Sequence, residues 1–219
     1  MHFIAQHNSP VTPLPIVVEA ASLFHEKDVR VLDMGVGSGR NAIYLAGLGF
    51  RIDAIDSSAP TISALEEYIR VYPLPVRASV QDVRHFDPTF NAYDLMLCTQ
   101  MLHYLSPLRA LSLLARARSA ARPGAMHVIA AITNAGDFHD LCGSENYFYP
   151  APSGIVDIYR KEGWEIHSHY EIERGMRQSN AAGGRMRNLV SFLIATNFHR
   201  SVPAPGRNWR RSLRRGSPR

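Results

Sequence analysis

The sequence has no long apolar run, few cysteines and no basic leader, and each absence excludes a class of protein. No apolar run among its 219 residues approaches the roughly 18–20 residues that a membrane-spanning helix needs. Glu19 interrupts the apolar stretch 14–24, and no lysine or arginine precedes it, so we expect neither a signal peptide nor a membrane partner. Cys98 and Cys142 stand far apart, and the histidines form no HxxH or HExxH set. We therefore expect a reduced, cytoplasmic protein with no metal site.

The formal net charge of +5 is concentrated at one end of the chain. Seven arginines and no acidic residue lie within residues 200–219, which leaves a net charge of −2 on the rest. Because this end has too little apolar surface to fold, we expect it to be a basic, disordered tail. Residues 1–27 begin with a proline-rich segment, and an apolar stretch that we expect to be helical follows it. We expect this segment to cap a single domain formed by residues 28–199.

Strand and helix patterns alternate along residues 28–199. Short apolar runs predict strands, and the amphipathic stretches between them predict helices. The predicted strands are 29–34, 51–55, 76–80, 93–98 and 126–132, the predicted helices are 41–48, 59–71, 105–121 and 153–162, and 165–171 with 189–195 form a closing antiparallel pair. This order predicts an α/β, Rossmann-like fold: a mostly parallel, seven-stranded sheet with an antiparallel last strand and helices on both faces.

A glycine-rich loop follows the first predicted strand and reads Asp-Met-Gly-Val-Gly-Ser-Gly-Arg-Asn. Glycines at alternate positions let a backbone turn sharply and approach a ligand closely, and the following helix start offers free N–H donors. A dinucleotide site would need its third glycine where Arg40 stands. The pattern DxGxGxG is instead typical of S-adenosylmethionine sites. The cofactor-binding candidates in this loop are Asp33, Gly35, Gly37, Gly39, Arg40 and Asn41.

Further cofactor-binding candidates stand at the ends of the next three strands. Asp56, followed by Ser57, ends the second strand and can accept hydrogen bonds from both ribose hydroxyls, whereas Asp53 falls inside that strand. Past the third strand, Asp82 can accept from the adenine amino group and Val83 can lie against the ring. Thr99 ends the fourth strand. A lone glycine turn is often only a tight turn, but open α/β sheets bind ligands where all these strands end.

From about residue 29 to residue 197 the chain resembles the tellurite-resistance methyltransferase family of class I methyltransferases. The resemblance is carried by the segments 31–45, 93–105, 123–125 with 129–131, and 185–195. The resemblance implies that residues 28–199 are a methyltransferase domain with S-adenosyl-L-methionine as cofactor. It also implies a small-molecule methyl acceptor that is soft (sulfur, selenium or tellurium) or oxyanionic.

At the acceptor end this family has a His–Arg pair and a later arginine. Arg177 and Arg185 occupy the arginine positions, and Met176 stands at the histidine position. Arginine binds carboxylates and oxyanions through bidentate hydrogen bonds, so these two arginines are candidate catalytic residues. The change at Met176 argues against tellurite itself as the substrate.

His103, just after the fourth strand, is the third candidate catalytic residue. It could orient an acceptor, act as a base, or only pack against the next helix. Gln100 and Tyr104 are weaker candidates nearby, and the aromatic run 147–149 could wall the pocket. A soft acceptor needs little or no general base, because methyl transfer from a sulfonium is an in-line displacement.

Four other classes remain as alternatives to a soft-acceptor enzyme. An N- or O-methyltransferase of a secondary metabolite fits the same cofactor motifs. A nucleic-acid methyltransferase would fit the basic tail, but residues 98–101 lack the Asn/Asp-Pro-Pro-aromatic motif of exocyclic-amine methylation. The glycine spacing argues against a nicotinamide oxidoreductase, and a non-enzymatic nucleoside sensor would share the cofactor motifs without turnover.

Overall fold

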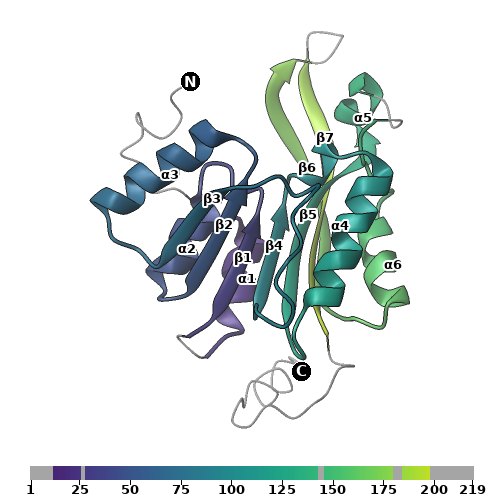
Figure 1. Ribbon diagram of the computed structural model, residues 1–219. Helices are drawn as coiled ribbons and strands as arrows, with labels where there is room; N and C mark the ends of the chain where they lie inside the picture. The colour runs from purple at the N-terminus through teal and green to yellow at the C-terminus, as the bar shows by residue number, and fades with distance from the viewer. Residues whose placement is uncertain (1–11, 26–27, 143–145, 180–183, 198–219) are drawn as a thin grey trace, which may run out of the picture.

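A seven-stranded sheet forms the centre of the computed structural model, which describes residues 12–25, 28–142, 146–179 and 184–197 (Figure 1). The strand order is β3-β2-β1-β4-β5-β7-β6, with β1 to β5 parallel and β7 antiparallel to both of its neighbours. The strands are β1 Arg30–Met34, β2 Arg51–Asp56, β3 Val76–Val80, β4 Leu95–Thr99, β5 Met126–Gly136, β6 Glu165–Ser179 and β7 Arg185–Thr196. The predicted fold class is therefore confirmed.

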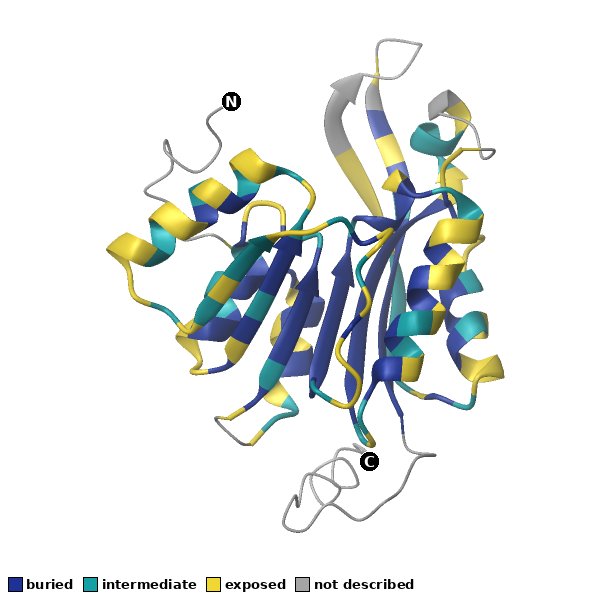
Figure 2. Ribbon diagram, viewed as in Figure 1, coloured by how far each residue is buried: buried dark blue, intermediate teal, exposed yellow. Residues whose placement is uncertain are grey.

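Helices cover both faces of the sheet, and each face buries its own apolar cluster (Figures 1 and 2). Successive residues of a strand point to opposite faces, so Val31 joins the cluster under α1, α2 and α3, whereas Leu32 joins the cluster under α4 and α6. The helices are α1 Pro15–Ser22, α2 Arg40–Gly47, α3 Ala59–Val71, the 3-10 turn η1 Leu102–Tyr104, α4 Pro107–Ala120, α5 Asp137–Cys142 and α6 Gly154–Lys161.

The predicted residue ranges match those of α3 and β3 and differ from the observed ranges of the other elements. The predicted helix 105–121 begins later, at α4, because Leu105 has an extended backbone and Pro107 stands at the first turn of α4; the separate turn η1 precedes it. Helix α5 was not predicted. β5, β6 and β7 all run further than predicted, and β6 and β7 continue past the sheet as a two-stranded ribbon (Figure 1). Ladder hydrogen bonds extend this ribbon through exposed Glu173 and Arg174, where no apolar alternation marks a strand.

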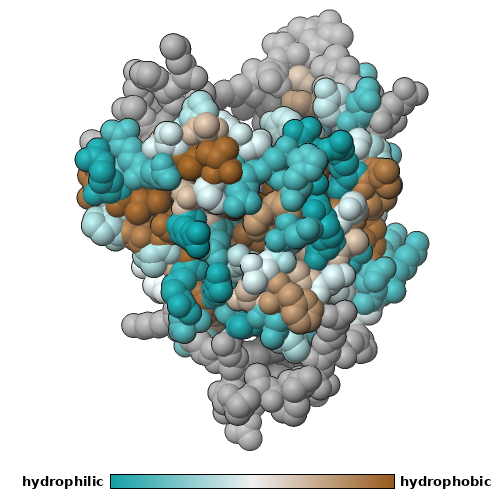
Figure 3. Space-filling model, in the orientation of Figure 1, coloured by the Kyte–Doolittle hydropathy of each residue, from teal (hydrophilic) through white to brown (hydrophobic). Residues whose placement is uncertain are grey.

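Helix α1 lies within the segment predicted to cap the domain. It packs against β5 and β7 and buries Ile16, Val17 and Ala20. Residues 1–11 and the predicted basic tail 200–219 lie outside the described residues. Among the helices of the described part, none is long and apolar enough to cross a membrane. Hydrophilic side chains predominate on the face shown in Figure 3, where hydrophobic ones gather in separate patches.

Candidate active site

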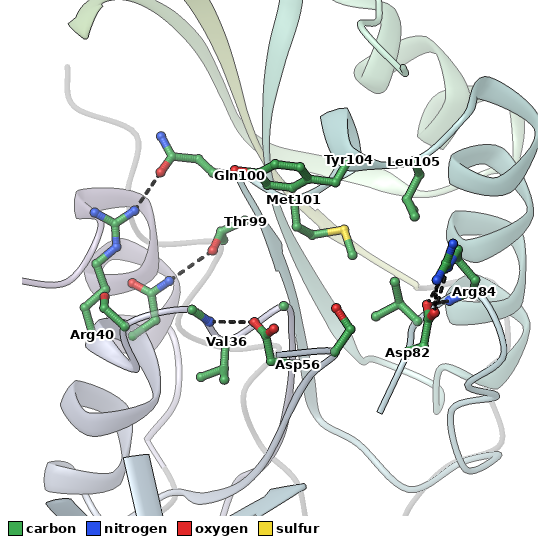
Figure 4. A pocket seen from close by; sticks show the side chains of 16 residues that line it. Val36, Arg40, Asp56, Asp82, Arg84, Thr99, Gln100, Met101, Tyr104 and Leu105 are labelled. Carbon is green, nitrogen blue, oxygen red and sulfur yellow. Dashed lines mark hydrogen bonds and ion pairs between the residues drawn. The ribbon is translucent and has the colours of Figure 1, made fainter. Parts of the chain in front are cut away.

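A pocket opens where the parallel strands end, between the loops that follow β1, β2, β3 and β4 (Figure 4). Its volume is about 620 Å³, within the range of roughly 300–1,000 Å³ typical of small-molecule sites. The described residues that line it are Gly35, Val36, Gly37, Ser38, Arg40, Asn41, Asp56, Ser57, Asp82, Val83, Arg84, Thr99, Gln100, Met101, Tyr104 and Leu105. Nine of the eleven predicted cofactor residues are among them, whereas Asp33 and Gly39 are not.

All three glycines of the loop have the left-handed backbone that glycine favours, with φ of 74°, 53° and 76° at Gly35, Gly37 and Gly39. A Cβ atom at Gly39 would lie 2.9 Å from Leu65 Cδ1, so this glycine permits close packing of α2 against α3. A Cβ atom at Gly37 would meet only the Gly35 carbonyl oxygen, at 4.0 Å. The space beside Gly37 is therefore open to a ligand.

Asp56 stands at the middle of the pocket, and the backbone of two loops holds its carboxylate. The N–H of Gly37 donates to Oδ2 at 3.0 Å, and the N–H of Ser58 donates to Oδ1 at 2.9 Å. A carboxylate has about four acceptor positions, so two remain for the hydroxyls of a ligand. Asp53, the other acid of β2, pairs with Arg30 at 2.9 Å instead.

Asp33 is the most unusual charged group near the pocket. It is 1% exposed, and neither carboxylate oxygen has a hydrogen-bond partner among the described residues. Burial raises the pKa of Asp33 to about 7, although the positive charge of Arg40 opposes the rise. An unpartnered buried carboxylate destabilises a fold, so this residue fits a function that supplies it with a cation.

Arg40 and Gln100 close one end of the pocket (Figure 4). Arg40 Nη2 donates to Gln100 Oε1 at 2.7 Å, and Gln100 has a strained backbone with φ of 54°. Burial lowers the pKa of Arg40, and the charge of Arg174 on β6 adds to this effect. Arginine stays protonated even so, so this end of the pocket is suited to an anionic group.

Asn41 connects the pocket to the N-terminal segment. Its Nδ2 donates to Thr99 Oγ1 at 3.1 Å, and its Oδ1 accepts from the Leu14 N–H at 3.0 Å. The Asn41 side chain is buried, so α1 and the end of β4 are held at fixed positions relative to the glycine loop.

Asp82 and Arg84 form the opposite end of the pocket (Figure 4). The guanidinium of Arg84 hydrogen-bonds the Asp82 carboxylate, which lowers the pKa of Asp82 to about 2. Val83, between them, is 8% exposed and adds apolar surface to the lining. Asp82 and Val83 were predicted from the sequence, whereas Arg84 was not, although it directly follows them.

The third side of the pocket is uncharged. Met101, Tyr104 and Leu105 line it, and Tyr104 is 74% exposed at its rim. His103 is not among the lining residues: its ring is buried, with its centroid 4.2 Å from that of Tyr104 and 6.4 Å from that of Tyr149. Burial lowers the pKa of His103 to about 4, and within the described part of the chain its Nδ1 has no hydrogen-bond partner.

The predicted acceptor arginines lie on the ribbon formed by β6 and β7. Ser179 pairs with Arg185, and Asn188 pairs with Gly136, the last residue of β5. Residues 185–187 thus extend past the carboxyl end of β5, at the same edge of the sheet as the pocket. Arg177 belongs to the facing strand, β6. The side chains of Arg177 and Arg185 lie outside the described residues.

The strand order, the antiparallel β7 and the pocket beyond the parallel strands define a Rossmann-like fold of the class I methyltransferase type. Within this class, the chain belongs to the family described as "Tellurite resistance protein TehB", whose family model matches residues 6–193. The resemblance predicted from the sequence is thereby confirmed.

Similar proteins of known name support this family assignment. The chain is 24% identical over 179 residues to "Probable S-adenosyl-L-methionine-dependent methyltransferase TehB" of Haemophilus influenzae, covering 82% of this chain. It spans 60% of that relative's length. The crystal structure of TehB from Haemophilus influenzae superimposes with a TM-score of 0.73 at 22% identity, over 84% of this chain and 62% of that chain.

A second similar structure is the 1,6-didemethyltoxoflavin-N1-methyltransferase of Burkholderia thailandensis, solved with 1,6-didemethyltoxoflavin and S-adenosylhomocysteine bound. The TM-score is 0.60 at 18% identity, over 84% of this chain and 78% of that chain. At these identities the likeness supports the fold alone.

Proposed function

We propose that this protein is an S-adenosyl-L-methionine-dependent methyltransferase that acts on a small molecule. The observation that carries the proposal is the order of groups along the pocket: Arg40 at one end, Asp56 in the middle and Asp82 at the other. This order matches the carboxylate, ribose and adenine of the cofactor. The name of the Haemophilus influenzae relative supports the same activity. We also propose a cytoplasmic location, because the two cysteines stand far apart in the sequence.

The described residues fit this cofactor group by group. Arg40 would bind the methionine carboxylate, and the buried Asp33 would compensate the positive charge of the methionine ammonium group. Asp56 keeps acceptor positions for the ribose hydroxyls, and Val83 offers an apolar surface to the adenine ring. Gly37 leaves open space for the ligand to approach the loop.

The bound cofactor would supply a methyl group on a positively charged sulfur. The task of the protein is to align an electron-rich acceptor atom with that methyl group and to exclude water. Met101, Tyr104 and Leu105 provide an apolar wall suited to both tasks. We propose that His103, whose ring lies beside that of Tyr104, orients the acceptor. Its low pKa, about 4, keeps the imidazole neutral at physiological pH.

A soft sulfur, selenium or tellurium acceptor, or an oxyanion, is our proposed substrate class. Such acceptors need little help from a base. The described residues on this side of the pocket, Met101, Tyr104 and Leu105, include no charged base. Arg177 and Arg185 would bind an acceptor's anionic group, and their strands reach the pocket edge of the sheet. A nitrogen heterocycle is the second candidate, because the Burkholderia neighbour is named as an N1-methyltransferase of such a compound.

A methyl-transfer assay tests this proposal. Methyl-labelled cofactor would be incubated with a thiol, a thioether, selenite, tellurite and a nitrogen heterocycle, and labelled product would be measured for the wild type and Asp56→Ala. We expect label on a soft or oxyanionic acceptor and its loss in the variant. Label on the heterocycle alone would replace the first candidate with the second. Equal product from both proteins would contradict the assigned site.

A further inference from the structure

We propose that Arg84 is a positioning residue: it fixes the Asp82 carboxylate so that the pocket accepts a base bearing an exocyclic amino group and rejects one bearing a carbonyl there. This inference rests on the proposed function, because it assumes that the ligand is a nucleoside. It goes further by assigning base selectivity to an ion pair that lines the pocket, although the Arg84 side chain is 49% exposed.

Arg84 holds Asp82 through its side chain and its backbone. The Nε atom donates to Oδ2 at 2.7 Å and to Oδ1 at 2.9 Å, and Nη2 contacts Oδ2 at 2.5 Å. The backbone N–H of Arg84 donates to Oδ1 at 2.9 Å. Three N–H donors make these four contacts, because Nε is shared between the two oxygens, so the carboxylate has little freedom to rotate. Figure 4 shows this pair at the end of the pocket that faces away from Arg40.

The held carboxylate can serve only as an acceptor. Arg84 lowers the pKa of Asp82 to about 2, so Asp82 carries no proton at neutral pH. The three donors of Arg84 leave about one of the four acceptor positions of the carboxylate free. The side chain of Asp82 is 26% exposed, so a ligand can reach it. The amino group of adenine can donate to a free position. The carbonyl of hypoxanthine would bring an oxygen lone pair against a negatively charged oxygen, which is unfavourable.

A different arginine holds the backbone of the same loop. Arg116 of α4 donates to the carbonyl oxygens of Val83 and Phe86 at 3.0 and 2.9 Å, and it pairs with Asp87 at 2.9 Å. Arg116 thus fixes where the loop lies, whereas Arg84 fixes how one carboxylate is oriented. Variants of the two arginines can separate these roles.

Calorimetric titration with S-adenosylhomocysteine and S-inosylhomocysteine tests the inference. We expect the wild type to prefer the adenine compound, and Arg84→Ala to reduce the ratio of the two affinities about tenfold. Arg116→Ala should weaken both ligands alike and leave the ratio unchanged. Arg77→Ala removes the same charge from an exposed position of β3, outside the pocket lining, and should change neither the two affinities nor their ratio.

A double-variant comparison tests whether Arg84 acts through Asp82. The amide of Asp82→Asn can turn its NH₂ toward a carbonyl, so this variant should bind the two bases nearly equally. Adding Arg84→Ala to it should change the ratio no further. An unchanged ratio in single Arg84→Ala, with S-adenosylhomocysteine still bound, would overturn this inference and leave the proposed function intact. Failure of the wild type to bind S-adenosylhomocysteine would overturn both.

Discussion

The backbone N–H of Gly37 lies 3.0 Å from Asp56 Oδ2 and donates a hydrogen bond to it. β1 and β2 are parallel neighbours in register, with Met34 opposite Ile55, so the loop after one strand meets the acid that ends the other. Two features that stand far apart in the sequence therefore form one preorganised unit. A ligand that binds there finds the Asp56 carboxylate already oriented, which reduces the entropy cost of binding.

The glycines of the loop should respond differently to alanine. Gly39→Ala would place Cβ 2.9 Å from Leu65 Cδ1 in a left-handed backbone, so we expect it to lower the free energy of unfolding by about 2–3 kcal/mol. Gly37→Ala adds only backbone strain, about 1 kcal/mol, but places a methyl group where the ligand approaches. Thermal melts and S-adenosylhomocysteine titrations separate the two effects.

Gly47→Ala is the control for these variants. Gly47 is the last residue of α2, and a Cβ atom there would meet nothing within 4 Å. Alanine should raise stability by up to roughly 1 kcal/mol, because it favours the helix. A melt in which Gly39→Ala is as stable as Gly47→Ala would contradict the packing role of Gly39.

Asp33→Asn should stabilise the cofactor-free protein above neutral pH. Burial raises the pKa of Asp33 from its ordinary 3.8 to about 7, so between these values the folded state holds a proton that the unfolded state has lost. The stability that this proton contributes is complete below pH 4 and lost as the pH rises through 7. Removing the ionisable group removes this loss, which amounts to a few kcal/mol.

Chemical denaturation at pH 4.5 and pH 8 measures the effect. Asp33→Asn should be more stable than the wild type at pH 8, and the difference should shrink at pH 4.5. The same variant should bind S-adenosylhomocysteine more weakly, since it no longer compensates the ammonium group. A variant that is less stable than the wild type at pH 8 would show that the Asp33 carboxylate has a partner in solution.

Much of the framework could be predicted from local patterns. The apolar faces of α3 and β3 have the periodicity of their elements, and proline residues mark where α3 begins and where the chain turns before β3. The alternation of strands and helices predicts a mostly parallel sheet with helices on both faces. Asp56 and Asp82 could be assigned because the carboxyl ends of parallel strands meet at one edge of the sheet.

The parts that could not be predicted depend on contacts between distant residues. Nothing near Gln100 in the sequence marks its positive φ, which accompanies its hydrogen bond to Arg40. The hydrogen bonds from Arg116 to the loop after β3 connect residues about 30 positions apart in the sequence. The ribbon formed by β6 and β7 is stabilised by backbone pairing and leaves no apolar pattern to detect.

Asn41→Ala should loosen the N-terminal segment. The variant loses the hydrogen bonds to Leu14 and Thr99 and leaves their polar groups buried without partners, so we expect a loss of about 2 kcal/mol. Limited proteolysis should then cut near α1 earlier than in the wild type. Ser22→Ala removes an exposed hydrogen bond within α1 and serves as the control. Equal cleavage of both variants would mean that other contacts hold α1.

His103→Phe tests the acceptor-side role of a neutral imidazole. Phenylalanine keeps a ring beside Tyr104 and Tyr149, so the affinity for S-adenosylhomocysteine should not change, whereas KM for the acceptor should rise about tenfold. Because burial lowers the pKa of His103 to about 4, the wild-type methyl-transfer rate should show no step near pH 6.5 from this residue. A step there that disappears in His103→Phe would contradict the neutral ring.

Calorimetric titration of S-adenosylhomocysteine and NAD into the wild type, Asp56→Ala and Asp53→Ala tests the central claim most directly. Asp53 is the matched acid of the same strand, paired with Arg30 rather than with the loop. We predict micromolar binding of S-adenosylhomocysteine by the wild type and Asp53→Ala, its loss in Asp56→Ala, and no binding of NAD. Binding of NAD without S-adenosylhomocysteine, or full affinity in Asp56→Ala, would contradict the assignment of this pocket to S-adenosyl-L-methionine.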